Sequence, residues 1–182
     1  TALYVKLSQG KVSIDEEKEL SFYERGWNLL AELGYAQYEI SNFAKPDAEC
    51  RHNMNTWRMH EWIGCGPSSA SQYNGERYQR PANLEEWCLG MESTTSPRTE
   101  HITLDDNLLL ADAVIFGLRM NSGVDLKTLN LRFAHATNRI DLETKLKFFE
   151  KEGLLKSKNT HYKLTHQGRL LCDSLGSNLL DV

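Results

Sequence analysis

The residues best suited to chemistry gather in one short segment of the sequence, residues 52–62. Its eleven positions hold two histidines, two asparagines, one arginine and two tryptophans, namely His52, Asn53, Asn55, Trp57, Arg58, His60 and Trp62. Such side chains can ligate a metal, donate hydrogen bonds or stack on a flat ligand, and functional residues often lie on the segments that connect regular elements. We therefore expect a site within the surrounding stretch, residues 38–71.

His52 admits two interpretations. Imidazole ligates haem iron or zinc readily, and a tryptophan nearby, such as Trp57, could line a flat apolar ligand. The same side chain could instead bond a backbone carbonyl and hold a loop in shape. Cys50 could share a metal with His52, but two ligands do not make a metal site.

A glycine-rich turn follows this segment, with the sequence Gly-Cys-Gly-Pro at residues 64–67. Glycines without a side chain let the backbone approach a ligand closely. The same four residues could equally form a tight turn.

Composition limits the class of protein. The chain has 182 residues, of which 40% are apolar and 25% are charged, as in an average soluble globular protein. Its formal net charge of −4 argues against a general attraction to nucleic acid or to an anionic membrane. No apolar run approaches the roughly 20 residues of a membrane span, and no signal peptide is visible.

The cysteines are scattered and form no C-x-x-C pair, so neither a zinc knuckle nor a disulfide framework is indicated. They are Cys50, Cys65, Cys88 and Cys172. A reduced, cytoplasmic location is therefore the expectation. The chain begins with Thr1 rather than Met, and we expect it to be part of something longer.

The first half of the chain predicts an α/β unit. Residues 2–7 are expected to form a strand, and residues 35–41 a second one. Between them, apolar residues at spacings of three and four predict a helix with one buried face, formed by Leu20, Tyr23, Trp27, Leu30 and Leu33. A short helix is expected over residues 84–91, followed by a polar linker.

The second half predicts a mostly helical module. Helices are expected up to Met120, over residues 125–133, from Asn138 to Gly153 and from Thr165 onward. A hairpin is predicted around residues 158–160. Helices followed by a two-stranded wing have the outline of a winged helix.

A winged helix suggests DNA binding, which the charges disfavour. Residues 141–170 carry seven Lys or Arg against four Asp or Glu. The helix most suited to enter a groove interleaves its lysines with Glu143, Glu150 and Glu152, a pattern typical of a solvated face. We expect no nucleic-acid partner.

Several motifs resemble those of a known family. They are Tyr-Glu-Ile-Ser-Asn-Phe-Ala at 38–44, Cys-Arg-His-Asn at 50–53, Trp57, the turn at 64–67, Gly-Leu-Arg at 117–119, Gly-Leu-Leu at 153–155 and Leu-Thr-x-x-Gly-Arg at 164–169. Together they resemble the oxygen-independent coproporphyrinogen III oxidase-like radical S-adenosylmethionine (SAM) proteins. The chain is more narrowly similar to their haem-chaperone branch, whose signature is H-N-x-x-Y-W.

The resemblance implies a domain arrangement. Residues 1–92 would be the trailing part of a partial (β/α) barrel with the segment that closes its mouth, and residues 93–104 a linker. Residues 105–182 would be the helical C-terminal domain. The C-x-x-x-C-x-x-C motif that holds a [4Fe-4S] cluster in this family, and the glycine-rich segments for SAM, are absent from this sequence.

The resemblance also implies site residues. In the chaperone branch the signature histidine is implicated in haem binding, which carries over to His52 as metal ligand. The signature places Asn53 and Trp57 beside it, and segments equivalent to Met54–Asn55 and to Ala70 lie near SAM in the oxidase branch. The sequence departs from the family pattern at Thr56, where tyrosine is usual, and at residues 68–70.

Two functions follow from the resemblance. One is a chaperone that binds haem and delivers it to acceptor proteins. The alternative is a coproporphyrinogen III oxidase, which decarboxylates a tetrapyrrole by radical SAM chemistry in porphyrin biosynthesis. In either case we expect no radical chemistry from this chain alone. A third hypothesis is that the C-terminal module docks a recipient protein or a second copy.

Overall fold

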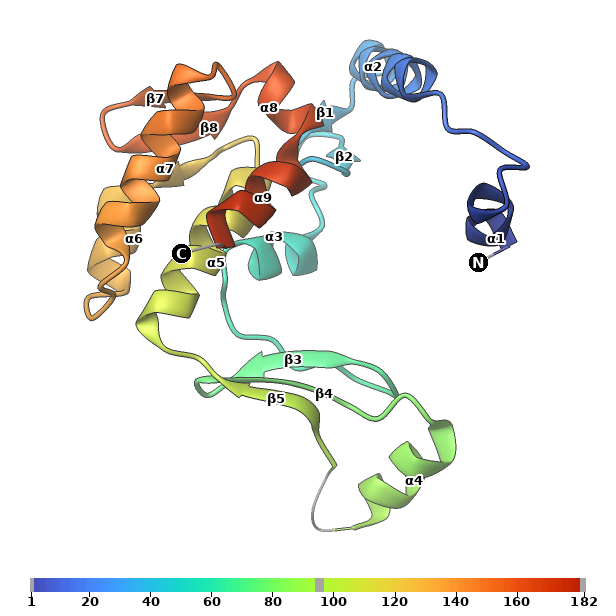
Figure 1. The fold of residues 1–182 in the computed structure, drawn as a ribbon. Helices are drawn as coiled ribbons and strands as arrows, with labels where there is room; N and C mark the ends of the chain where they lie inside the picture. The colour runs from blue at the N-terminus through green and yellow to red at the C-terminus, as the bar shows by residue number, and fades with distance from the viewer. Residues whose placement is uncertain (1, 94–96, 181–182) are drawn as a thin grey trace. The chain divides into compact units, whose positions relative to one another are not determined.

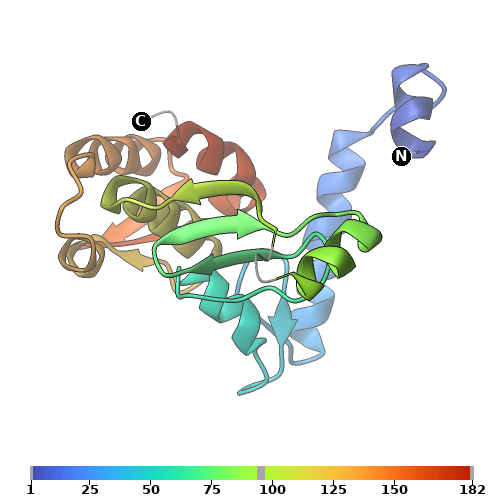
Figure 2. The same ribbon diagram turned by 90° about the horizontal axis from the view of Figure 1, so that it is seen from below.

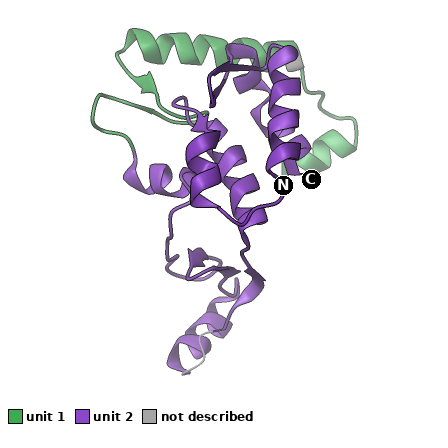
Figure 3. Cartoon of the chain, turned by 90° about the vertical axis from the view of Figure 1, so that its left-hand side faces the viewer, with its two compact units in different colours: residues 1–49 green, residues 50–182 purple. Residues whose placement is uncertain are grey.

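The computed structural model describes residues 2–93 and 97–180. They form two compact units, Thr1–Glu49 and Cys50–Val182 (Figure 3). Among the described residues, no helix combines the length and the apolar character that crossing a membrane requires.

The first unit contains two helices and two very short strands. They are α1 (Ala2–Ser8), α2 (Glu16–Glu32), β1 (Ala36–Gln37) and β2 (Phe43–Ala44). The strand predicted over residues 2–7 is wrong, because this segment is helix α1. A helix satisfies its backbone N–H and C=O groups within itself, whereas a strand needs a neighbour to pair with.

Helix α2 begins after Asp15, whose carboxylate accepts a hydrogen bond from the Lys18 amide at 3.0 Å. The burial predicted for its apolar face is wrong at Leu20, Tyr23 and Leu33, which are exposed, and the other two positions, Trp27 and Leu30, are only half-buried. Periodicity indicates which face of a helix is suited to burial, but another element must cover that face.

Strands β1 and β2 are antiparallel, with Gln37 opposite Phe43. Glu39 stabilises the turn between them, because its Oε1 atom accepts hydrogen bonds from the Ser41 amide and from the Asn42 side chain. Since the strands described in this unit are two residues long and antiparallel, the partial barrel stays a prediction.

The second unit opens with helix α3 (Arg51–Trp57) and a three-stranded antiparallel sheet in the order β3-β4-β5. The strands are β3 (Ala70–Tyr73), β4 (Glu76–Gln79) and β5 (Thr99–Thr103), and they lie side by side in two views (Figure 1, Figure 2). Helix α4 (Leu84–Glu92) follows β4, near the predicted bounds. Of the predicted linker 93–104, residues 94–96 lie outside the described residues, and residues 99–103 form β5.

A helical module with a second small sheet follows. Its elements are α5 (Asp106–Arg119), β6 (Val124–Asp125), α6 (Leu126–Arg132), α7 (Arg139–Lys151), β7 (Leu155–Lys158), β8 (His161–Leu164), α8 (His166–Leu170) and α9 (Cys172–Leu180). Strands β7 and β8 form the hairpin expected around residues 158–160, and β6 pairs with the other side of β8. The comparison of this module with a winged helix stays a prediction.

The core of the module consists of leucines and a valine from three helices, α5, α7 and α9: Leu110, Val114, Leu142, Leu146, Leu175 and Leu179. Helix α5 contributes the largest share, with seven buried residues. Gly117 lets β6 approach this helix, because a Cβ atom at position 117 would lie 2.3 Å from Cγ1 of Val124. Helix α5 thereby supports both the small sheet and, as described below, helix α3.

Candidate functional site

Helix α3 carries the signature residues singled out from the sequence, His52 to Trp57. The helix is seven residues long and has no side-chain cap at Cys50. A helix this short is marginal on its own, so contacts with the rest of the unit must hold it. Asn55 and Trp57 make such contacts, whereas the imidazole of His52 makes no hydrogen bond or ion pair with a described residue.

Asn55 fixes the C-terminal end of α3. Its side-chain Nδ2 atom donates a hydrogen bond to the carbonyl of Glu61 at 3.0 Å, and its own carbonyl accepts one from the His60 amide at 3.1 Å. These bonds shape the segment after the helix, which gives Asn55 a structural role.

Trp57 packs α3 against α5. Its ring centroid lies 5.8 Å from that of Phe116, and the Arg119 guanidinium lies 5.1 Å from the indole centroid. The indole is therefore in contact with α5 side chains, instead of presenting an open face to a flat ligand.

His52 lies in the first turn of α3 and is exposed. Its carbonyl accepts a hydrogen bond from the Thr56 hydroxyl at 3.1 Å, but the structure shows no hydrogen bond or ion pair from its imidazole to any described residue. The prediction that His52 bonds a backbone carbonyl therefore finds no support, and the ring nitrogens remain available to a ligand. Asn53 and Met54, which follow it, are half-buried.

Ala70 lies apart from α3 in the chain, at the start of β3. The loop before it is closed by two backbone hydrogen bonds between Trp62 and Gln72, at 2.8 and 3.0 Å. Within this loop, a Cβ atom on Gly64 would lie 2.3 Å from the Ala70 carbonyl oxygen. The structure thus explains Gly64 by a close approach of two backbone segments of this unit, which favours the tight-turn interpretation.

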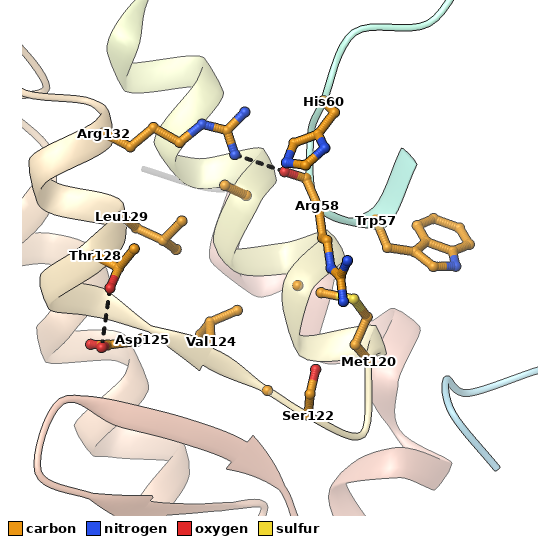
Figure 4. Close-up of a pocket in the computed structure, with 13 residues that line it drawn as sticks. Trp57, Arg58, His60, Met120, Ser122, Val124, Asp125, Thr128, Leu129 and Arg132 are labelled. Carbon is orange, nitrogen blue, oxygen red and sulfur yellow. Dashed lines mark hydrogen bonds between the residues drawn. The ribbon is translucent and has the colours of Figure 1, made fainter. Parts of the chain in front are cut away.

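A cavity of about 280 Å³ lies beside the end of α3 (Figure 4). Its walls come from the end of α3, from α5 and from the segment that contains β6 and α6. The residues that line it are Trp57, Arg58, His60, Ala113, Gly117, Met120, Ser122, Gly123, Val124, Asp125, Thr128, Leu129 and Arg132.

Arg132 links the two sides of this cavity. Its guanidinium donates hydrogen bonds to the carbonyls of Arg58, at 2.7 Å, and Met59. Burial lowers the pKa of His60 from its ordinary value, and the positive charges of Arg132 and Arg58 lower it further. No pattern in the sequence indicates Arg132, which lies more than 70 positions from its partners along the chain.

The described residues contain no group of three or more His, Cys, Asp or Glu side chains that could hold a metal ion. Cys50, Cys65 and Cys88 are exposed, Cys172 is buried, and none of them forms a disulfide. Because a [4Fe-4S] cluster is bound by grouped cysteine thiolates, these residues do not fit one.

Comparison with known proteins places this chain in a family. Residues 104–171 match the model of the HemN C-terminal domain. The chain is 34% identical over 133 residues to the mitochondrial radical S-adenosyl methionine domain-containing protein 1 of Danio rerio, covering 68% of this chain and 30% of that protein. It is 28% identical over 181 residues to the heme chaperone HemW of Mycobacterium tuberculosis, covering 99% of this chain and 44% of that protein.

A solved structure has a similar fold. The coproporphyrinogen III oxidase HemN from Escherichia coli, described as a radical SAM enzyme, superposes with a TM-score of 0.71 at 18% sequence identity, over 91% of this chain and 42% of that one. The chain thus spans less than half the length of these relatives. Together, the family model, the relatives and the shared fold confirm the family predicted from the motifs: the chain belongs to the HemN-like radical SAM family, of which it represents a C-terminal portion.

Proposed function

We propose that this chain is the C-terminal portion of a haem chaperone that binds haem through His52 and delivers it to an acceptor protein. The observation that carries the proposal is the exposed imidazole of His52, which has no partner among the described residues and lies on a helix anchored to α5. Relatives named as heme chaperones, which align with nearly the whole chain, support it.

The donor chemistry fits haem better than a bare metal ion. The macrocycle supplies four nitrogen ligands to the iron, so one protein imidazole is enough to hold it. A structural zinc ion would need about four protein ligands, and the described residues offer no such group. His52 would hold the iron through one nitrogen of its imidazole ring.

The surroundings of His52 suit a cargo that must be released. Trp57 and Asn55 hold α3 in place, whereas the imidazole itself is exposed to solvent. An exposed ligand leaves one side of the haem open to an acceptor. In this proposal Asn53 and Met54 border the bound macrocycle.

Asn55 and Ala70 are the weaker members of the predicted set. The Asn55 amide is used within the protein, and Ala70 offers only its exposed backbone and methyl group. The family resemblance implies a role beside SAM for Met54, Asn55 and Ala70. That role requires the cluster motif and the glycine-rich segments with which proteins of this family bind SAM, and these three residues do not supply them. The oxidase function stays an alternative, for which the likeness to HemN supplies the fold alone.

The expected location, the absence of a nucleic-acid partner and the domain bounds form part of this proposal. We propose a cytoplasmic location, supported by cysteines that form no disulfide among the described residues, and no nucleic-acid partner. The ion pair between Lys147 and Glu143 on α7, at 2.7 Å, supports the interpretation of this helix face as solvated. The domain bounds 1–92 and 105–182 are likewise proposed.

A haem titration tests the proposal. Haem is added to the chain and to the variants His52→Ala and His135→Ala while the Soret absorbance is followed. His135 is a matched control, because it is also exposed and its side chain shows no hydrogen bond or ion pair with any residue that the structure describes. We expect saturable binding by the chain and by His135→Ala, with a shifted Soret band, and its loss in His52→Ala at an unchanged melting temperature. Equal binding by all three proteins would remove His52 from the site, and absence of binding would refute the proposal for this chain.

A further inference from the structure

The cavity beside α3 has two chemically different sides. One side is apolar, formed by Ala113, Val124 and Leu129 with the methionine side chain of Met120. The other side carries basic groups from the end of α3 and from α6. Figure 4 shows the Arg58 side chain extending toward Met120 and Ser122, with the His60 ring beside the guanidinium of Arg132.

Neither Arg58 nor Arg132 forms an ion pair with a carboxylate among the described residues. Arg132 is engaged with two backbone carbonyls, which carry no net charge. The structure shows no hydrogen bond or ion pair for the Arg58 guanidinium among the described residues. A guanidinium that points into a partly apolar cavity without a partner is well placed to bind an anion.

Asp125, the acidic residue that lines the cavity, does not serve as the anion for Arg58. The Oδ1 atom of Asp125 accepts hydrogen bonds from the Lys127 amide at 3.0 Å and the Thr160 hydroxyl at 2.7 Å. Its Oδ2 atom accepts one from the Thr128 hydroxyl at 3.2 Å. These bonds lower the pKa of Asp125, the one from Thr160 most, so the carboxylate stays charged and is used to cap α6.

We propose that this cavity binds a carboxylate carried on a short apolar chain. Arg58 takes the carboxylate, because the two N–H groups of a guanidinium fork match the two oxygens of a carboxylate. The methylene groups lie against Val124, Leu129 and Met120. At about 280 Å³ the cavity is at the small end of ligand sites, and it suits a side chain or a small acid.

His60 provides a reporter inside the site. Its pKa is lowered by burial and by the charges of Arg132 and Arg58. A bound carboxylate places a negative charge beside the same ring and therefore raises the pKa of His60 toward its ordinary value. Asp125, Arg58 and Arg132 are the other titratable groups that line the cavity.

Butyrate is a suitable probe, and butanol is its neutral counterpart of equal chain length. The ring protons of His60 are followed by NMR during titration of the chain with each compound. We expect a saturable shift and a raised His60 pKa with butyrate, and a much weaker response to butanol. In Arg58→Gln, butyrate binding is expected to weaken about tenfold or more, since a charged hydrogen bond is lost.

Arg51→Gln is the matched control, because Arg51 is also exposed and lies at the other end of α3. It is expected to bind butyrate as the unchanged chain does. Equal butyrate affinity in the chain and in Arg58→Gln would overturn the proposal, and so would butanol that binds as tightly as butyrate.

The carboxylate could belong to a free small acid or to a propionate group of a tetrapyrrole, and the second source rests on the proposed function. Haem and its dimethyl ester, which lacks free carboxylates, separate the two. If the source is the tetrapyrrole, the chain binds the ester more weakly than haem, Arg58→Gln removes that difference, and His52→Ala weakens both. Equal affinity for haem and ester assigns the site to a free acid. A butyrate response without any effect of His52→Ala on haem would refute the proposed function alone.

Discussion

The buried ion pair between Arg77 and Asp112 offers a sharp test of how the β3–β4–β5 sheet is held to α5. The two side chains are 25% and 7% exposed, and Arg77 Nη2 lies 2.7 Å from Asp112 Oδ2. The same nitrogen donates to Gln72 Oε1 at 2.6 Å, and Gln72 is itself buried. These three residues connect β3, β4 and α5, so Asp112→Asn should weaken the attachment of the sheet.

The expected magnitude follows from the burial of the pair. Removing one partner of a fully buried ion pair costs about 3–5 kcal/mol, because the other charge is left without compensation. Arg77 is a quarter exposed and keeps Gln72, and the asparagine keeps an amide oxygen that can accept a hydrogen bond. We therefore expect a loss of about 2 kcal/mol, which corresponds to a fall of about 4–8 °C in Tm for a chain of this length.

Urea unfolding at pH 7 and thermal melts measure this loss. Glu76→Gln is a matched control, since it also removes one carboxylate from the same sheet, where Glu76 pairs with Arg98 at 2.6 Å and with His101 at 3.0 Å, but its side chain is 35% exposed, against 7% for Asp112. It should leave the urea midpoint unchanged within error. Equal midpoint shifts in the two variants would refute the reasoning, because burial would then not determine the cost.

Two further predictions concern the core and the pH dependence. Leu146→Ala should lower the free energy of unfolding by about 3–5 kcal/mol, because this side chain is completely buried, whereas Leu131→Ala, at a leucine that is 74% exposed, should change the urea midpoint little. The pKa of His60 is lowered in the folded state, so protonation of His60 opposes folding. The stability that the neutral ring contributes is fully present above its ordinary pKa of 6.5 and is lost as the pH falls through its folded-state pKa. Urea midpoints between about pH 5 and pH 7 should therefore rise with pH in the chain, and less steeply in His60→Gln; an equal slope in both would contradict this assignment.

The C-terminal module was largely predictable because its signals are local. Apolar residues of α5 and α7 recur with helical spacing, and polar residues around Asn159 separate two short apolar runs. Such patterns constrain neighbouring residues directly, which explains why the hairpin of β7 and β8 appears where it was expected.

The sheet of β3, β4 and β5 was missed although its turn has a clear signal. Asn74 and Gly75 have φ angles of 53° and 74°, which the Asn-Gly pair of a tight hairpin turn adopts readily. Most of the flanking residues are polar, and the neighbours Ser71 and Gln72 are both buried, so no alternation of apolar and polar residues marked these segments as strands. Segment 2–7 shows the opposite error, since β-branched and aromatic residues suggested a strand without any partner to pair with.

The candidate site was predictable in part. Motif residues identified α3 and His52, but the packing of Trp57 on Phe116 and the bonds from Arg132 to the end of α3 depend on contacts between distant segments. A single sequence carries no local pattern for such contacts. The cavity, which depends on them, became visible only in the structure.

The strand order β6-β8-β7 has a consequence for how the module assembles during synthesis. β7 and β8 are joined by a two-residue turn and can pair within about 10 μs once both exist. Val124 of β6 pairs with Tyr162 of β8, and helices α6 and α7 lie between them in the chain. The ribosome therefore releases β6 well before β8. Synthesis of the residues between these two strands takes seconds at about 5–20 residues per second. Until then β6 has an unpaired edge, and the small sheet can be completed only after both enclosed helices have been made.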